Sequence, residues 1–109
     1  MKASELIFPG LQCVQPASGD VEITGGYTSD LLSDVMAHIK DGDALITIQA
    51  HKNTIAVASF TGAPAVIFCH GRTAAPDVLE TAAKENIAVF VSSGSQYETT
   101  CALAKALGE

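Results

Sequence analysis

Short runs of apolar residues alternate with helix-like segments along most of this chain. Three of these runs, at residues 44–48, 65–69 and 87–91, are apolar almost throughout. Such continuous runs are typical of strands that are buried on both faces, whereas a half-exposed strand alternates apolar and polar positions. Because helical segments separate the runs, the pattern predicts an α/β fold with a parallel sheet that is covered on both faces.

Four helical segments accompany these strands. Apolar residues at helical spacing predict the first helix: Leu31, Leu32, Val35, Met36 and Ile39. Thr28 or Ser29 is its expected cap, and Asp30 favours its positive end. Residues 53–60 are apolar nearly all round, which favours a buried helix over a strand, although so short a stretch fits both. Pro76 suits the start of a third helix. Ser95 and Glu98 form a capping box for the last helix, expected to end at Gly108.

The N-terminal quarter contains shorter elements. Residues 4–8 suit a short helix, residues 11–14 a strand, residues 16–20 a turn and residues 21–24 a second strand. Gly25 and Gly26 follow directly, which predicts either a backbone turn that a Cβ would obstruct or a close approach by another group. We expect the motif Thr24-Gly25-Gly26-Tyr27 to form a structural corner or a contact between subunits. An anion site there is disfavoured because Asp30 and Asp34 follow.

Composition narrows the function. The 109 residues suit one domain, spanning 1–109, and no apolar run approaches the roughly 18–20 residues of a membrane span, so a cytoplasmic protein without membrane contact is expected. A net charge of −6 with six basic residues argues against a nucleic-acid partner. Hydrophobic residues make up 48% and charged residues 17%, an apolar excess that predicts a homodimer or a partner protein.

The three cysteines are far apart and form no CxxC motif. Cys13, Cys69 and Cys101 are therefore each expected to be a small buried hydrophobe, with neither a disulfide framework nor a zinc site.

Polar residues gather where the expected parallel strands end. They are His51, Lys52, Asn53, His70, Arg72, Ser93 and Ser95. Ligands of open parallel sheets bind beyond the carboxyl ends of the strands. Histidines, cations and hydroxyls in an otherwise acidic chain suggest a site for a small anionic ligand there. Ordinary solvated loop tips are the competing interpretation.

Catalytic and metal motifs are missing. The chain has no Gly-Lys pair, which excludes a P-loop, and no GxGxxG motif. Cys69 and His70 are neighbours on one strand and would point to opposite faces, so they are not expected to bind a metal together with His51. Asp30 and Asp34 are expected to be solvated acids on the outer face of one helix, and His38 a surface residue near its end. No catalytic residue, metal or cofactor is expected.

Two segments carry a resemblance to a known family. The residues from Glu22-Ile23-Thr24-Gly25-Gly26-Tyr27 through Met36, and the segment Gly42 to Gln49 with His51 and Asn53, resemble the DRTGG domain family. The likeness spans residues 4–107, with Glu22-Ile23 in place of the leading Asp-Arg. Such domains are similar to the N-terminal domain of HPr kinase/phosphorylase and occur in phosphate acetyltransferases and CBS-domain pyrophosphatases. The resemblance implies a three-layer α/β/α fold, with about four to five mainly parallel strands, a non-catalytic regulatory role and a tendency to dimerise.

Two functional hypotheses remain. The first is a non-enzymatic regulatory module, dimeric, that binds a small anionic metabolite, a nucleotide or a partner protein. The second is a small enzyme that acts on a phosphorylated or acyl substrate at the strand ends, with His51 or His70 as general acid or base and Lys52 and Arg72 holding the anion.

Overall fold

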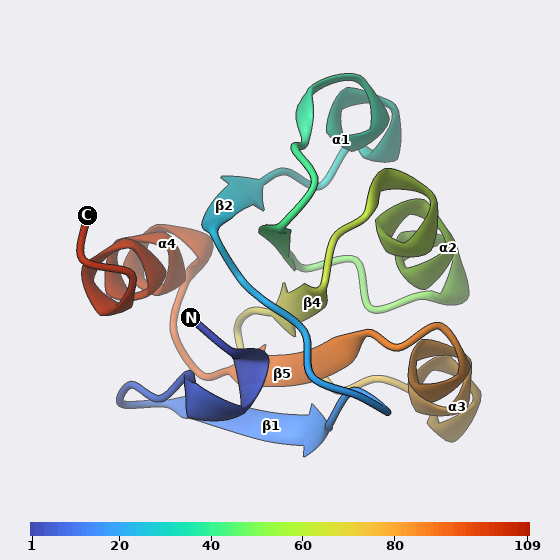
Figure 1. Ribbon diagram of the computed structural model, residues 1–109, viewed down its shortest axis with the longest axis horizontal. Helices are drawn as coiled ribbons and strands as arrows, with labels where there is room; N and C mark the ends of the chain where they lie inside the picture. Colours follow the sequence, from blue (N-terminus) through green and yellow to red (C-terminus); the bar gives the residue numbers. More distant parts are fainter.

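The computed structural model describes residues 1–109 and contains one five-stranded sheet between two layers of helices (Figure 1). The strands are β1 (Leu11–Gln15), β2 (Gly25–Thr28), β3 (Asp43–Thr47), β4 (Ala65–Phe68) and β5 (Ala88–Ser92). They lie in the order β1-β5-β4-β3-β2, and all pairs are parallel except β1 with β5. This arrangement confirms the predicted α/β class with a mainly parallel sheet.

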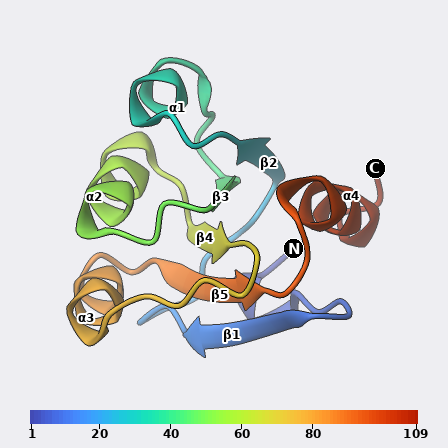
Figure 2. The ribbon, with the colours of Figure 1, turned by 180° about the vertical axis from the view of Figure 1, so that it is seen from behind.

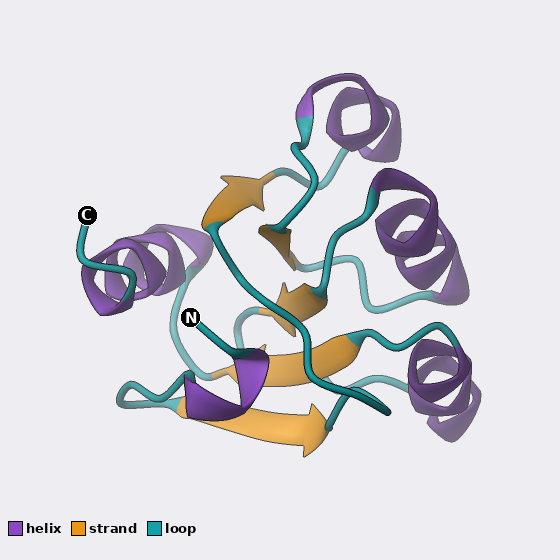
Figure 3. Ribbon diagram, in the orientation of Figure 1, coloured by secondary structure: helices purple, strands orange, loops and turns teal.

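The helices divide between the two faces of the sheet. Helices α1 (Leu32–His38), α2 (Lys52–Thr61) and α3 (Pro76–Lys84) cover one face, and α4 (Gln96–Ala106) covers the other together with the short 3-10 helix η1 (Ala3–Glu5) (Figures 1 and 2). The three-layer architecture is therefore as expected. Figure 3 shows that short loops make most of the connections between helices and strands.

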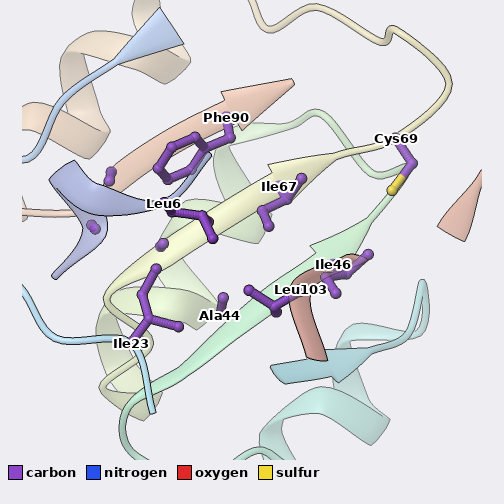
Figure 4. Packing of buried hydrophobic residues seen from close by; sticks show 11 residues of the cluster. Leu6, Ile23, Ala44, Ile46, Ile67, Cys69, Phe90 and Leu103 are labelled. Carbon is purple, nitrogen blue, oxygen red and sulfur yellow. The ribbon is translucent and has the colours of Figure 1, made fainter. Parts of the chain in front are cut away.

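Each face of the sheet has its own hydrophobic core, because successive side chains of a strand point to opposite faces. On the α4 side, Ile46, Ile67 and Phe90 pack with Leu103 of α4 and with Leu6 and Ile23 (Figure 4). On the other side, Leu45, Val66 and Phe68 pack against α1, α2 and α3. The three central strands β3, β4 and β5 are buried on both faces, which explains their continuous apolar runs.

The second strand differs from its prediction. Strand β2 is formed by Gly25–Thr28, whereas residues 21–24 carry only an isolated bridge to the N-terminal segment. Gly25 and Gly26 thus lie within a strand and not in a corner, and neither has a positive φ. Close approach explains both residues. A Cβ on Gly26 would lie 2.8 Å from Leu103 Cδ2, and a Cβ on Gly25 would lie 2.6 Å from Asp43 Oδ1.

Helix α1 begins later than expected. Leu31 occupies the N-cap position, so Thr28 and Ser29 do not cap the helix, and Asp30 lies in the preceding loop. The prediction that Asp30 and Asp34 share the outer face of a helix is therefore wrong. Instead, Oδ1 of the Asp30 carboxylate accepts hydrogen bonds from Thr47 and Ile48 at the end of β3.

Helices α2, α3 and α4 lie where the sequence pattern predicts them, whereas the short helix predicted at residues 4–8 is only the 3-10 helix η1 at Ala3–Glu5. The ambiguous segment around residues 53–60 is a helix, and α4 begins with the expected capping box. The Glu98 amide donates to Ser95 Oγ at 3.1 Å, and the Ser95 amide donates to Glu98 Oε1 at 2.9 Å. His38 is exposed in the last turn of α1, as expected.

Only one cysteine follows its prediction. Cys69 is buried, but Cys13 and Cys101 are exposed. Both exposed thiols lie on elements that the apolar pattern leaves half uncovered, namely the edge strand β1 and the outer side of α4. No helix has the length and apolar character needed to cross a membrane.

Candidate functional site at the carboxyl ends of the strands

Asp30 lies at the centre of a polar cluster where β2, β3 and α4 meet. Its Oδ1 atom accepts three hydrogen bonds, from the Thr47 hydroxyl at 2.8 Å, the Ile48 amide at 2.9 Å and the Gln96 side-chain amide at 3.0 Å. No group of the protein donates to its Oδ2 atom. The carboxylate therefore holds the strand end and the start of α4 together while one oxygen stays free.

The surroundings keep this carboxyl group ionised. Burial alone would raise the pKa of Asp30, but the three donors and the positive charge of Arg72 outweigh it, so the pKa lies below its usual value. Arg72 and Asp30 form no ion pair, which leaves the exposed guanidinium available to another group. A free carboxylate oxygen and a free guanidinium thus lie at the same edge of the sheet.

A second group of polar side chains joins α4 to the neighbouring strand ends. The hydroxyls of Ser92 and Thr99 are both buried and lie 2.8 Å apart. Burial raises the pKa of the nearby Cys69 thiol; a contact with Thr99 opposes this rise, and the negative charge of Asp30 adds to it. These buried polar groups form hydrogen bonds with one another and stabilise the fold. A ligand at this edge would therefore contact the exposed side chains outside this group.

The predicted cations have unequal surroundings. Lys52 Nζ lies 3.4 Å from Asp77 Oδ2, so this lysine already has an anionic partner at the start of α3. His70 is exposed, and its charge helps to lower the pKa of Glu98 after the stronger effect of the hydrogen bonds at Ser95. Arg72 is the cation that the structure brings close to Asp30 without pairing it.

The other predicted site residues are dispersed. His51 is exposed at the N-cap position of α2, and Asn53 is exposed in the first turn of that helix. Ser95 uses its hydroxyl to cap α4. Ser93 lies against Gly10, whose carbonyl accepts from the Ser93 amide at 3.0 Å. The strand-end edge therefore does not gather all seven residues into one cluster.

Two backbone features shape the loop after β4. His70 and Gly71 both adopt left-handed conformations, with φ of 57° and 65°. Their amides donate to the carbonyls of Gly94 and Ser92, each at 2.8 Å. This tight turn holds the loop against the end of β5, and Arg72 follows it directly.

The Thr24-Gly25-Gly26-Tyr27 motif lies at the edge of the sheet, away from this cluster. The Tyr27 hydroxyl donates to Asp34 Oδ2 at 2.7 Å, and His38 Nδ1 lies 3.1 Å from Asp34 Oδ1. The bond to Asp34 raises the pKa of Tyr27 and, as the largest of several effects, lowers the pKa of Asp34. Asp34 is thus a bonded partner in a small surface network.

Sequence reasoning missed the central residues of the site. Asp30 was expected on the outside of a helix, and Thr47, Gln96 and Thr99 were not singled out. The available signal was the position of Asp30 at a strand-to-helix junction of an α/β fold, where the loop reaches the carboxyl edge. No three His, Cys, Asp or Glu side chains converge in a way that could hold a metal ion.

Comparisons with known proteins support the fold. No family description matches the sequence, and no curated protein is similar to it in sequence. A solved structure is similar: the CBS and DRTGG domains of the regulatory region of Clostridium perfringens pyrophosphatase, complexed with its activator, diadenosine tetraphosphate. The TM-score is 0.69 at 17% identity, and the match covers 89% of this chain but 43% of that chain. The fold is thus DRTGG-like.

Proposed function

We propose that this chain is a DRTGG-type regulatory module, non-catalytic and dimeric, that binds a small anionic metabolite or nucleotide at the carboxyl edge of its sheet. The observation that carries the proposal is the exposed Arg72 guanidinium, which forms no ion pair and lies close to the Asp30 carboxylate that three donors fix and that is free at Oδ2. A fixed acceptor of this kind suits a hydroxyl or amino group of a ligand, and Arg72 suits its phosphate.

Two residues of this cluster are followed in the sequence by a large exposed side chain. Leu31 follows Asp30 directly and is 64% exposed, and Tyr97 follows Gln96 and is 79% exposed. An aromatic ring beside polar groups suits the base of a nucleotide, which can stack on it. The similar pyrophosphatase region was solved with a dinucleotide activator. This likeness supports a nucleotide as the first ligand class to test.

The enzymatic alternative lacks a comparable observation. Neither His51 nor His70 forms a hydrogen bond with a side chain that could act as nucleophile or acid-base partner. His51 occupies the N-cap position of α2, and His70 lies in the tight turn after β4. A general acid or base needs a second group within hydrogen-bond reach of the reacting atom. We therefore favour the regulatory module.

Isothermal titration against AMP, ATP, diadenosine tetraphosphate and inorganic phosphate tests the proposal. At least one nucleotide should bind, and Arg72→Ala should weaken that binding about tenfold, equivalent to about 1.4 kcal/mol. Lys105→Ala is the matched control, because Lys105 is an exposed cation in the last turn of α4, far along the chain from Asp30. If none of these compounds binds to the folded protein, ligand binding is contradicted. Equal loss in both variants would place the ligand elsewhere.

A further inference from the structure

The two edges of the sheet differ in how they are protected. Exposed edge strands can pair with other chains, and proteins usually block them with charges, prolines or bulges. Strand β1 has an irregular register between Cys13 and Gln15, and Pro16 follows it. Strand β2 consists of Gly25, Gly26, Tyr27 and Thr28, without a charge, a proline or a register shift. Strand β2 is short, at four residues, but its outer edge carries none of the charges, prolines or bulges that protect other edges.

We propose that two copies of this chain associate by antiparallel pairing of their β2 strands about a twofold axis through Gly26, so that their sheets become continuous. The proposal specifies the interface of the dimer proposed above and is independent of the ligand. Strand β2 ends the sheet, with α1 and α4 on either side of it (Figures 1 and 2). Its outer backbone edge therefore meets no other strand of the chain.

The backbone pattern defines the register. The Thr24 amide donates to the Gly42 carbonyl, toward β3, at 2.9 Å. Because the direction of backbone groups alternates along a strand, the amides and carbonyls of Gly25 and Tyr27 point away from β3. With the axis at Gly26, Gly25 of each chain opposes Tyr27 of the other, and each such pair exchanges two hydrogen bonds. The open groups of both strands are then satisfied.

Side chains permit this close approach. Gly25 has none, so the partner's Tyr27 can lie beside it, and the bond to Asp34 already holds the Tyr27 ring in place. Gly26 at the axis offers no side chain to collide with its own copy. Thr24, Gly26 and Thr28 are exposed, and a hollow of about 520 Å³ borders residues 24–27.

A second copy fits this edge better than an unrelated peptide. A twofold interface must be complementary to itself, since the same residues meet from both sides. Pairing of glycine with tyrosine on each side of the axis meets this condition without any change in the strand. An extended peptide from another protein would use the same amides, but its side chains opposite Gly25 and Tyr27 would need to match by coincidence.

Sedimentation of charged variants tests the interface. The wild-type chain should sediment as a dimer at micromolar concentration. Thr24→Lys combined with Thr28→Lys places like charges opposite each other at both ends of the pairing, which should raise the dissociation constant of the dimer at least about tenfold. Gln12→Lys combined with Gln15→Lys adds the same charge to β1 and should leave the dimer intact. A wild-type chain of single-chain mass, or a dimer insensitive to the β2 variant, would overturn the proposal.

Disulfide trapping provides a second test that does not depend on weakened binding. Thr24→Cys and Thr28→Cys, in a chain with Cys13→Ser and Cys101→Ser, should form a covalent dimer under mild oxidation. The two positions oppose each other across the axis, with their Cβ atoms about 4.5–5.5 Å apart. Gln12→Cys in the same background should stay monomeric on a non-reducing gel. Equal trapping at both positions, or none at β2, would overturn the proposed register. Either result would leave the titration of ligands unaffected.

Discussion

Gly26 of β2 lies directly against Leu103 of α4, and the contact leaves no room for a side chain. An added Cβ would meet Leu103 Cδ2 at 2.8 Å, and the Leu103 side chain is 2% exposed within the core on that face. The second glycine of the sequence motif therefore serves helix packing. It allows α4 to approach the edge strand at the distance that the core requires.

Gly26→Ala should lower the free energy of unfolding by about 1–3 kcal/mol, because the new methyl group overpacks the contact with Leu103. Urea denaturation measures the change. In a Leu103→Ala background the same substitution should cost much less, with a coupling energy of about 0.5–3 kcal/mol between the two positions. Additive effects of the two substitutions would show that this contact does not require the glycine.

Asp30→Ala should lower the free energy of unfolding by about 2–3 kcal/mol at neutral pH, since three donors lose an ionised acceptor. Gln96→Ala removes a single donor and should cost about 1 kcal/mol. Asp30→Asn keeps an oxygen for the donors and should fall between them. A variant ranking in which Gln96→Ala costs most would contradict the central place of Asp30.

Acid should weaken the fold through the same carboxylate. The pKa of Asp30 is lower in the folded chain than the value of about 3.9 expected for an unfolded chain. Its stabilising effect is therefore complete above that value and is lost as the pH falls through the lower folded pKa. Stability measured between pH 2 and pH 5 should depend less on pH in Asp30→Asn than in the wild type. Parallel curves would contradict this assignment.

Tyr27→Phe should raise the pKa of Asp34 toward the ordinary value of about 3.9, because the hydrogen bond from Tyr27 is the largest effect that lowers it. Titration of the carboxyl carbon by NMR measures this shift. Glu98 provides an internal reference, since the Ser95 hydrogen bonds that lower its pKa are untouched by the substitution. An unchanged Asp34 titration would show that the bond is absent in solution.

A thiol reagent should label two of the three cysteines in the native protein, namely the exposed Cys13 and Cys101. Although Cys13 is exposed, neighbouring atoms partly desolvate its thiol and raise its pKa, so less thiolate is present at neutral pH and its labelling should be slower than that of a free cysteine in solution. Cys69 should react only after unfolding. Mass spectrometry of the labelled peptides distinguishes the three sites, and rapid native labelling of Cys69 would contradict its burial.

Local patterns account for the parts of the fold that were predicted well. The apolar runs at β3, β4 and β5, Pro76 at the start of α3 and the Ser95 capping box each act within a few residues. Their physical cause, burial of a strand or satisfaction of a helix amide, can be read from neighbouring positions. The same patterns placed the carboxyl edge of the sheet correctly, because parallel strands end together.

The functions of individual residues at that edge depended on distances between segments far apart in the chain. Lys52 is paired because α3 brings Asp77 to it, and Asp30 is central because Gln96 arrives from 66 positions away. Gly25 and Gly26 likewise owe their role to Asp43 and Leu103. Periodicity and capping are short-range properties, so the amino-acid order could specify the strands, the helices and the edge where they meet. Which charges pair, which oxygen stays free and which glycine another element packs against were decided only when the sheet assembled.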